Sequence, residues 1–412
     1  MAHIAIVGAG ITGVTSAYAL LEQGHDVTVF ERHSLAAMET SYANGGQLSA
    51  SNAEVWNHVS NVLKWPKSLF QPAAPLLLNL KPSWHKYSWL AEFLAQIPNY
   101  RKNTVSTVQL AVRSREALMD IAARENIDFD LEKRGILHIY EDKKSFAHAE
   151  KVNAMLKEGG LERRPVTPQE IASIEPALHG EFYGGFYTAS DASGDIHMFS
   201  RGLAEVCRDK GATFHYDTEI HRIDAEANGV SLAWTPGETA QNHGACEITN
   251  ADAVVICAGV ASRRFAAMLG DRLNIYPVKG YSITVDLEDE NSRKGAPWVS
   301  LLDDAAKIVS SRFGDNRLRI AGTAEFNGFN RDIREDRIAP LTAWSRKRFP
   351  DIRHESVVPW AGLRPMMPDM LPRVGPGKKP RVFYNTGHGH LGWTLSGGTA
   401  EILAACVGTQ LS

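Results

Sequence analysis

The sequence predicts an α/β protein in which a parallel sheet with helices on its faces adjoins a second, β-rich region. Three observations support this class. The chain opens with an apolar run, a glycine-rich turn and an apolar helix, the pattern of a β-α-β unit. Residues 275–323 show several short alternating runs, which predict an antiparallel sheet with one exposed face. Residues 382–407 return to the order of strand, glycine loop and helix.

The first unit, residues 3–31, carries three glycines in the spacing of a dinucleotide-binding turn. Gly8 permits the tight turn, Gly10 lets the backbone approach a pyrophosphate, and Gly13 lets the helix pack on its strand. The phosphates would then lie at the helix N-terminus. Glu31 follows Gly13 by 18 positions, close to the spacing of an acid that binds a ribose hydroxyl. This unit predicts a bound adenine dinucleotide without deciding between nicotinamide and flavin.

Residues 39–49 form a loop of small and amide side chains directly after the ribose-binding strand. Small residues let the backbone come within hydrogen-bonding distance of a flat ring. Ser41, Asn44 and Gln47 add polar groups for a pyrophosphate and for ring carbonyls. The alternative is an ordinary polar loop of turn-forming residues.

The C-terminal region favours flavin. A strand is predicted over residues 382–386, a second glycine loop over 387–394 and an apolar helix over 396–407. Such a unit can return to the N-terminal sheet and direct another helix N-terminus at the cofactor. In flavoproteins that position stabilises the pyrimidine edge of the ring, which becomes anionic on reduction. We therefore expect FAD.

The middle of the chain is predicted to alternate between helices and strands. Helices are expected over residues 105–126 and 199–211, strands over 135–140, 184–187, 213–223 and 252–259, and a hairpin over 230–234 and 246–248. Strand 252–259 is apolar throughout, so we expect it beside the nucleotide-binding strands. The dinucleotide-binding domain is then assembled from segments on both sides of the β-rich region. With 412 residues, 44% of them hydrophobic, the chain is long enough for two domains.

Charge and cysteine content exclude several functions. A formal net charge of −3 and a sequence pI near 6.6 give no electrostatic case for nucleic-acid binding. The cysteines, Cys207, Cys246, Cys257 and Cys406, lack CxxC spacing, so we expect buried thiols in a reducing compartment and neither a metal site nor disulfides. The early glycines interrupt the N-terminal apolar run, so no secretory signal is predicted and a cytoplasmic protein is expected.

Residues 56–100 are rich in Trp and Leu, but their apolar runs are too short to span a bilayer. Together with Lys64, Lys67, Lys81 and Lys86, they predict a peripheral contact with the inner face of the cell membrane. The alternative is that they pack as a lid and a domain interface.

Five motifs along the chain resemble one known family. They occupy residues 39–49, 276–284, 322–330, 360–369 and 385–394. Together they resemble the FAD-dependent D-amino acid dehydrogenases of the small-subunit type, relatives of glycine oxidase, sarcosine oxidase and D-amino acid oxidase. The match covers nearly the whole chain, and the motifs stand in the same order.

The resemblance implies an α/β fold with a Rossmann-like FAD-binding domain of the glutathione-reductase-2 type and an antiparallel β-rich substrate domain. Residues 1–80, 190–270 and 355–412 are assigned to the first, and 81–189 and 271–354 to the second. The residues expected to contact non-covalent FAD are Gly8, Gly10, Ile11, Thr12, Gly13, Glu31, Arg32, Ser41, Asn44, Gly45, Gly46, Gln47, Leu48, Gly259, Gly362, Gly389, His390, Gly392, Trp393 and Thr394.

Arg364 is the first candidate for the chemistry. Gly362 and Pro365 restrict the backbone around it, and its planar guanidinium can bind an α-carboxylate through two hydrogen bonds. By resemblance, this arginine holds the substrate carboxylate. The alternative is an ion pair between domains.

Tyr281 and His388 complete the predicted catalytic set. We expect Tyr281 and Lys279 to face the flavin, although a tyrosine in a dry strand is as often part of the core. His388 and His390 titrate near neutrality in water. Either could instead bond to the ring edge, because removing hydride from a carbon that bears a neutral amine needs no strong base.

The resemblance implies oxidative deamination of D-amino acids to 2-oxo acids and ammonia, with electrons passed to a quinone-type acceptor. The alternatives are an oxygen-using amine oxidase of the glycine or sarcosine oxidase kind, a D-proline or D-hydroxyproline dehydrogenase, and a flavin-binding subunit without turnover. Residues 317–322 lack the lysine that helps sarcosine oxidases react with oxygen. Residues 364–367 lack a cysteine for covalent attachment of flavin.

Overall fold

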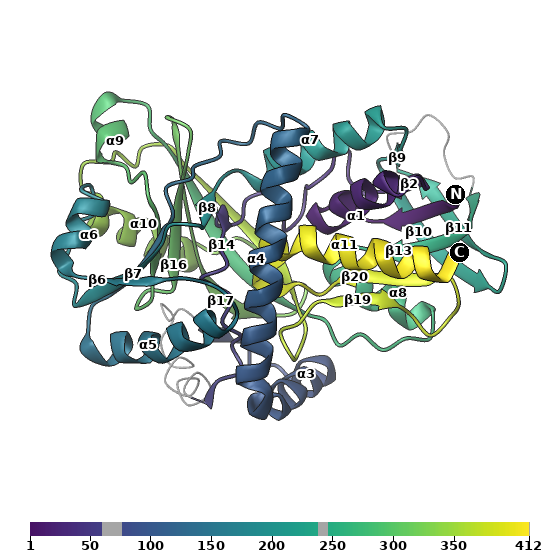
Figure 1. Ribbon diagram of the computed structural model, residues 1–412, viewed down its shortest axis with the longest axis horizontal. Helices are drawn as coiled ribbons and strands as arrows, with labels where there is room; N and C mark the ends of the chain where they lie inside the picture. Colours follow the sequence, from purple (N-terminus) through teal and green to yellow (C-terminus); the bar gives the residue numbers. More distant parts are fainter. Residues whose placement is uncertain (60–75, 238–245, 412) are drawn as a thin grey trace.

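The computed structural model describes residues 1–59, 76–237 and 246–411. Two large sheets lie side by side along the long axis of the molecule (Figure 1). Both chain ends lie at the right-hand end of the molecule in this view, beside the first sheet, and the sheet on the left is built from the middle of the chain.

The first sheet has six strands in the order β19-β20-β13-β1-β2-β9. The strands are β1 (His3–Val7), β2 (Asp26–Phe30), β9 (Thr213–His215), β13 (Ala253–Ile256), β19 (Arg373–Pro376) and β20 (Val382–Thr386). All neighbours pair in parallel except β19 with β20. The prediction that strand 252–259 lies beside the nucleotide-binding strands is confirmed, because Ile4 to Val7 pair with Ala253 to Ile256.

Both faces of this sheet are covered, which explains why its central strands β1, β2 and β13 are mainly apolar and almost fully buried. One face packs against three helices: α1 (Ile11–Glu22), α7 (Ile196–Asp209) and α11 (Gly392–Leu411). The other packs against helix α8 (Ser262–Met268) and a separate sheet of β10 (Thr218–Glu226), β11 (Gly229–Pro236) and β12 (Glu247–Ala251). The predicted hairpin is therefore confirmed as β11 with β12.

The second sheet has nine strands in the order β18-β14-β17-β16-β15-β5-β7-β6, with β4 paired to β17. The strands are β4 (Leu76–Leu78), β5 (Ile136–Tyr140), β6 (Arg164–Val166), β7 (Gly184–Thr188), β14 (Tyr276–Asp286), β15 (Ser300–Asp303), β16 (Ile308–Phe313), β17 (Arg317–Phe326) and β18 (Val357–Met366). Most pairs are antiparallel, but β5 with β15 and β4 with β17 are parallel.

The prediction that strands 275–323 leave one face exposed is wrong. Strands β14 and β17 are buried at nearly every position. On one face, side chains of both strands pack under helix α10 (Glu335–Arg348). On the opposite face lies the loop of residues 39–49, which accepts hydrogen bonds from Ser282 and Arg319. Alternation along a strand cannot show this, because small and polar residues on the second face are buried against backbone.

The remaining helices connect and cover the two sheets. They are α3 (Trp84–Ala95), α4 (Tyr100–Arg124), α5 (Lys143–Glu158), α6 (Pro168–Ile174), α9 (Glu290–Gly295) and the short η1 (Ile97–Asn99), η2 (Gly259–Ala261) and η3 (Gly389–Leu391). Helix α4 packs on both α11 and α5 and crosses the middle of the molecule (Figure 1). Side-chain caps fix several starts; Asp195, for example, accepts the N–H groups of His197 and Met198.

Three further assignments differ from the sequence predictions. The strand expected over residues 213–223 is divided between β9 in the six-stranded sheet and β10 in the three-stranded sheet. Helix α11 begins at Gly392, so most of the predicted glycine loop is helical or in η3. Cys207 and Cys257 are buried, but Cys246 is exposed and Cys406 is partly exposed, contrary to prediction; Cys246 directly precedes β12, the edge strand of the three-stranded sheet. Burial raises the pKa of the Cys257 thiol to about 12.

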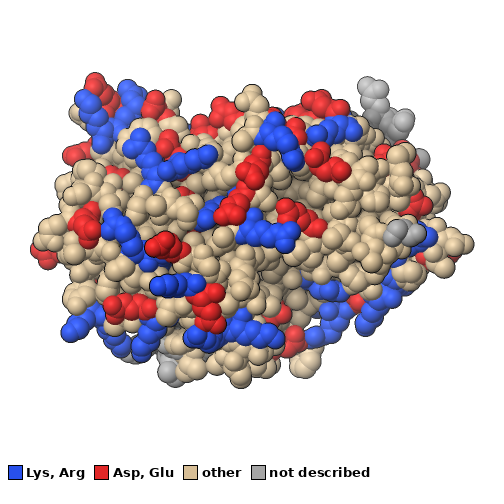
Figure 2. Space-filling view, viewed as in Figure 1, with Lys and Arg blue, Asp and Glu red and all other residues tan. Residues whose placement is uncertain are grey.

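Strands β4 and β18 belong to the nine-stranded sheet although they lie in segments assigned to the FAD-binding domain. The two sheets are further joined by β3 (Gln47–Leu48) with β8 (Ala192–Ser193). On the face seen in Figure 2, acidic and basic side chains are interspersed over most of the surface. Surface ion pairs include Arg113 with Glu401, at 2.6 Å.

Candidate active site

The glycine turn after β1 leaves space at one of its three glycines. A Cβ at Gly8, whose φ is +102°, would lie 2.8 Å from the Cys257 carbonyl oxygen, and one at Gly13 would lie 1.8 Å from the Gly8 oxygen. Packing therefore requires both glycines. At Gly10 the nearest atom is Ser41 Oγ at 3.6 Å, so the polypeptide itself would tolerate a side chain. The open space at Gly10 is what a pyrophosphate at the N-terminus of α1 needs.

Glu31 lies at the end of β2 and is buried against this turn. Its carboxylate accepts the N–H of Ala9 at 2.7 Å and that of His33 at 3.0 Å. These bonds hold the carboxylate beside the glycine turn, where we expect it to accept a ribose hydroxyl. The guanidinium of Arg32 pairs with Glu39, the first residue of the loop 39–49.

The loop of residues 39–49 lies between the two sheets, and its polar side chains bond to the protein. Ser41 Oγ accepts the N–H of Ile11 at 3.1 Å. Asn44 Oδ1 accepts the N–H of Gly46 at 2.9 Å, and Gln47 donates to Ser300 Oγ at 2.9 Å. These bonds fix the loop backbone, so its contacts to a flat ring would come mainly from main-chain groups and not from the amide side chains.

The second sheet fixes the carbonyl groups of the same loop. Ser282 and Ser311 donate to the oxygens of Ala43 and Gly45 at 2.7 and 2.8 Å. Arg319 donates to the oxygen of Asn44 at 3.2 Å, and burial lowers the pKa of this arginine to about 10. The structure therefore joins the N-terminal loop to strands more than 230 positions later in the chain.

The start of α11 meets the far end of this loop. Thr394 Oγ1 accepts the N–H of Ser49 at 3.1 Å. Asp191 holds the next turn, since its carboxylate accepts the N–H groups of Ala50 and Ser51 at 2.9 and 3.0 Å. Trp393 is turned away into the core, where its ring lies 6.1 Å from that of Phe129.

Arg364, on β18, presents a cation without a carboxylate partner. Its guanidinium lies over Gly280 of β14, where an added Cβ would come within 2.3 Å of Cζ. Its Nη1 donates to the carbonyl oxygen of Thr323 at 3.0 Å. No ion pair to Arg364 occurs among residues 1–59, 76–237 and 246–411. Burial lowers its pKa to about 10, as expected for a cation without a counter-ion.

Two histidines lie near the same region and are held neutral. Burial lowers the pKa of His388 to about 3 and that of His390 to about 4. His388 Nε2 bonds to Thr399 Oγ1 at 3.0 Å. His390 stacks on Trp56 with ring centroids 4.9 Å apart, and the positive charge of Arg364 further disfavours its protonation. Neither ring is suited to accept a proton at neutral pH.

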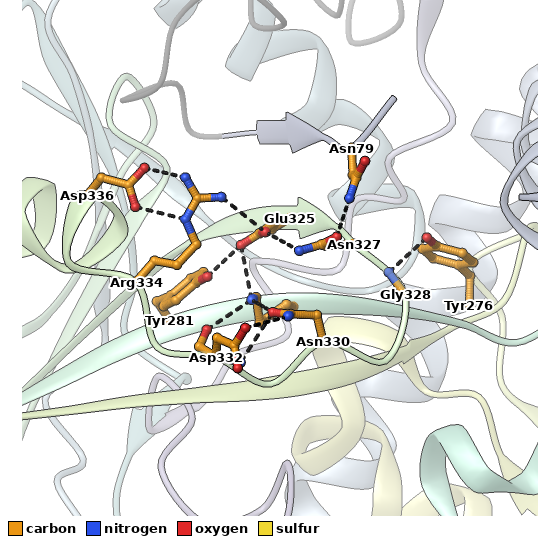
Figure 3. A network of polar contacts seen from close by, with 11 residues as sticks. Asn79, Tyr276, Tyr281, Glu325, Asn327, Gly328, Asn330, Asp332, Arg334 and Asp336 are labelled. Atoms are coloured by element: carbon orange, nitrogen blue, oxygen red, sulfur yellow. Dashed lines mark hydrogen bonds and ion pairs between the residues drawn. The ribbon is translucent and has the colours of Figure 1, made fainter. Parts of the chain in front are cut away.

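Tyr281 and Lys279 lie on the other face of β14 from Gly280 and Ser282. The Tyr281 hydroxyl donates to Glu325, and Lys279 pairs with the same carboxylate at 3.3 Å (Figure 3). Tyr281 packs in the apolar cluster beneath α10. The structure therefore brings Arg364 together with the loop of residues 39–49 and the loop of residues 387–394. It places Tyr281 on the face of β14 opposite to the one that contacts the guanidinium of Arg364.

Sequence reasoning missed Gly280 and Thr323. Both act through backbone: Gly280 leaves room for the guanidinium, and Thr323 supplies the carbonyl oxygen that it contacts. Gly280 in the middle of the predicted strand 276–284 was an available signal, because a glycine inside a strand often marks a close approach.

The glycine turn, the parallel β1-α1-β2 unit and the buried acid after β2 define a dinucleotide-binding fold. The comparisons with known proteins agree. The family model described as "DAO: FAD dependent oxidoreductase" matches residues 3–406, and the chain belongs to this family. The cofactor is accordingly FAD, which fits the space at Gly10 and the carboxylate of Glu31.

Curated relatives and solved structures match over almost the full length. The chain is 61% identical to D-amino acid dehydrogenase 3 of Mesorhizobium japonicum, over 100% of this chain and 98% of the relative. It is 40% identical to D-amino acid dehydrogenase of Paramagnetospirillum magneticum, over 98% and 94%. Glycine oxidase from Geobacillus kaustophilus has a similar fold, with a TM-score of 0.76 at 22% identity over 100% and 96% of the two chains.

Proposed function

We propose that the protein oxidises D-amino acids, using FAD, to 2-oxo acids and ammonia. The observation that carries the proposal is the guanidinium of Arg364, which is buried beside Gly280 and lacks a counter-ion among the described residues. An unpaired buried charge is costly, so such a site favours an anionic ligand. A substrate carboxylate can satisfy it through two hydrogen bonds. The relatives named D-amino acid dehydrogenase support the choice of D-amino acids.

The protein's part in the reaction is binding and orientation. Arg364 would hold the carboxylate, and the fixed loop of residues 39–49 would hold the ring against which the α-carbon must lie. Bound FAD supplies a two-electron acceptor for hydride from the α-carbon. His388 and His390 have pKa values too low for an efficient general base, so the substrate amine is expected to react in its neutral form. The resulting imine is then hydrolysed by water.

A quinone-type electron acceptor at a membrane surface belongs to the same proposal. The dehydrogenase names of the relatives and the absence of lysine from residues 317–322 support an acceptor other than oxygen. Leu80 and Trp84, which are 65% and 86% exposed, stand beside Lys81 at the start of α3 and could contact lipid. Lys64 and Lys67 lie outside the described residues. No described helix is both long and apolar enough to cross a bilayer.

An anaerobic reduction assay tests the proposal. The purified FAD-loaded protein is mixed with D- and L-amino acids, glycine, sarcosine and proline, and loss of flavin absorbance is followed. Reduction by D-amino acids and slow reduction by their L-forms is the expected pattern. Preferential reduction by glycine or sarcosine would indicate an amine oxidase, and preferential reduction by D-proline would indicate a proline dehydrogenase. No reduction by any amine would indicate a flavin-binding subunit without turnover.

The electron acceptor is tested separately. The reduced protein is exposed to air or to a soluble quinone, and the rate of flavin reoxidation is measured. We expect reoxidation by quinone to be much faster than by oxygen. Peroxide formation in air at the rate of quinone reduction would contradict the acceptor assignment.

A further inference from the structure

Glu325 of β17 is the centre of a buried polar cluster that the proposed chemistry does not use (Figure 3). Its carboxylate accepts the hydroxyl of Tyr281 and the amide of Asn327, the latter at 2.9 Å. It also pairs with Lys279 at 3.3 Å, and the two charged side chains are 1% and 0% exposed. Burial and the hydrogen bond to Glu325 raise the pKa of Tyr281, so its hydroxyl remains a donor.

Lys279 ties the cluster to the chain before α10. Its ammonium donates to Asn330 Oδ1 at 2.6 Å and to the carbonyl oxygen of Asp332 at 3.0 Å. Arg334 approaches the other side of Glu325, at 3.7 Å. A buried ion pair of this kind adds little net stability, because desolvation offsets the attraction. Its best-attested use is to fix one arrangement of the strands that carry it.

The arrangement it fixes is a β-bulge next to Arg364. Lys279 pairs with Glu325, and Tyr281 pairs with Gly322, so Gly280 faces two residues of β17. One of them, Thr323, has a φ of +60°, which is strained for a β-branched residue. Its buried Oγ1 has no hydrogen-bond partner among the described residues. Such a backbone persists only where its neighbours hold it in place.

The bulge turns the Thr323 carbonyl toward the substrate-binding arginine. Arg364 Nη1 donates to that oxygen at 3.0 Å, and Gly280, across the bulge, leaves the space that the guanidinium fills. Lys279 and Glu325 form the residue pair at one end of the bulge, and Tyr281 and Gly322 form the pair at the other end. The ion pair and the hydrogen bond from Tyr281 therefore link the two ends through one carboxylate.

We infer that Glu325, Lys279 and Tyr281 are positioning residues for substrate: they hold the Thr323 bulge, and the bulge orients the guanidinium of Arg364 for the carboxylate. The inference rests on the proposed function, since it assigns Arg364 to substrate. It gives Tyr281 a role through Arg364 and not as a contact of the reacting atoms.

Binding of a plain carboxylate tests this role without turnover. The FAD-loaded protein is titrated with propionate, and the change in flavin absorbance gives the Kd. We expect Glu325→Gln to weaken propionate about tenfold and Tyr281→Phe about threefold, as expected when a charge-assisted bond loses its geometry. KM for the D-amino acid should rise by similar factors while kcat changes less, and FAD content should stay unchanged.

Asp303→Asn is the matched control. Asp303 lies in the same sheet, is 1% exposed, and binds Arg348 and Trp344 at 2.8 and 2.9 Å, away from the bulge. This change should lower the melting temperature and leave the propionate Kd within twofold of the original. In an Arg364→Lys background, Glu325→Gln should raise the propionate Kd by less than about twofold, because the bond from Arg364 to Thr323 is then already lost.

The possible outcomes separate the two proposals. If Glu325→Gln does not fold, Tyr281→Phe decides, because it removes only one hydroxyl. Propionate binding as tight as in the original protein for both variants would overturn the inference, even if D-amino acids reduce the flavin. If propionate binds and both variants weaken it, but no D-amino acid reduces the flavin, the proposed function fails and the positioning role stands. No binding of propionate by the original protein would overturn both assignments of Arg364.

Discussion

Gly280→Ala is the substitution that most sharply separates substrate binding from folding. The glycine lies in β14 directly beneath the guanidinium of Arg364. An added methyl would lie 2.3 Å from Cζ and Nη2 and 2.4 Å from Nη1 of that arginine. Ordinary contacts to a Cβ begin near 3.4 Å, so the guanidinium would have to move by about 1 Å.

This displacement sets the expected magnitude. A misplacement of roughly 1 Å in an orienting group can lower a rate about 100-fold. We therefore expect kcat/KM for D-amino acids to fall by about two orders of magnitude, corresponding to about 2.7 kcal/mol. The loss should appear mainly in KM, because the group that moves binds carboxylate. FAD content should not change, since Gly280 faces Arg364 and not the glycine turn.

The assay is anaerobic stopped-flow reduction of the flavin at several substrate concentrations. Gly408→Ala in α11 is the matched control, because its Cβ would meet only Gln23 Oε1 at 3.5 Å, an ordinary contact. That control should keep its kinetics. A Gly280→Ala protein with unchanged KM would refute the assignment of Arg364 to the substrate carboxylate, and one that loses FAD would show that the strand supports the cofactor instead.

Three further predictions follow from the site. Gly10→Val should abolish FAD binding, because its side chain would fill the space for the pyrophosphate. The cofactor-free variant should keep its melting temperature within about 2 °C, because only Ser41 Oγ, at 3.6 Å, lies near the new Cβ. Equal FAD content in variant and original would contradict the pyrophosphate site. Propionate affinity should be constant from about pH 7 to 9 and fall about tenfold per unit above pH 10, because burial lowers the Arg364 pKa to about 10 and only the protonated form binds an anion. A flat profile to pH 11 would contradict the lowered pKa of Arg364. Arg364→Lys should keep less than about a tenth of the original kcat/KM, since an ammonium cannot replace the planar guanidinium. A kcat/KM close to that of the original protein would show that a positive charge alone suffices.

The cofactor half of the site could be predicted from the sequence because it depends on local pattern. Glycine spacing, an apolar strand and an acid at a fixed distance define the turn, and the structure places Gly8, Gly13 and Glu31 as expected. The start of α11 was predicted four residues late, since two glycines and a tryptophan obscured the helix pattern. Helix packing against α1 and α4 overrides that weak local preference.

The substrate half depends on contacts between distant strands, and local pattern does not encode them. The side on which Tyr281 lies is set by the pairing of β14 with β17 and β18, whose register shifts at a bulge. One such shift is enough to change what a neighbouring residue faces. Thr323 carried no signal, because a threonine in a strand is ordinary and only its φ of +60° marks it.

The role of Arg364 is the central claim, and a pair of substrates that differ only in the carboxylate tests it most directly. Flavin reduction by D-alanine and by D-alaninamide is compared in the original protein and in Arg364→Ala. The account predicts that loss of the carboxylate lowers kcat/KM by two to three orders of magnitude in the original protein, about 3–4 kcal/mol, and less than about fivefold in the variant. An equal penalty in both proteins, or an Arg364→Ala protein that keeps its KM for D-alanine, would contradict it.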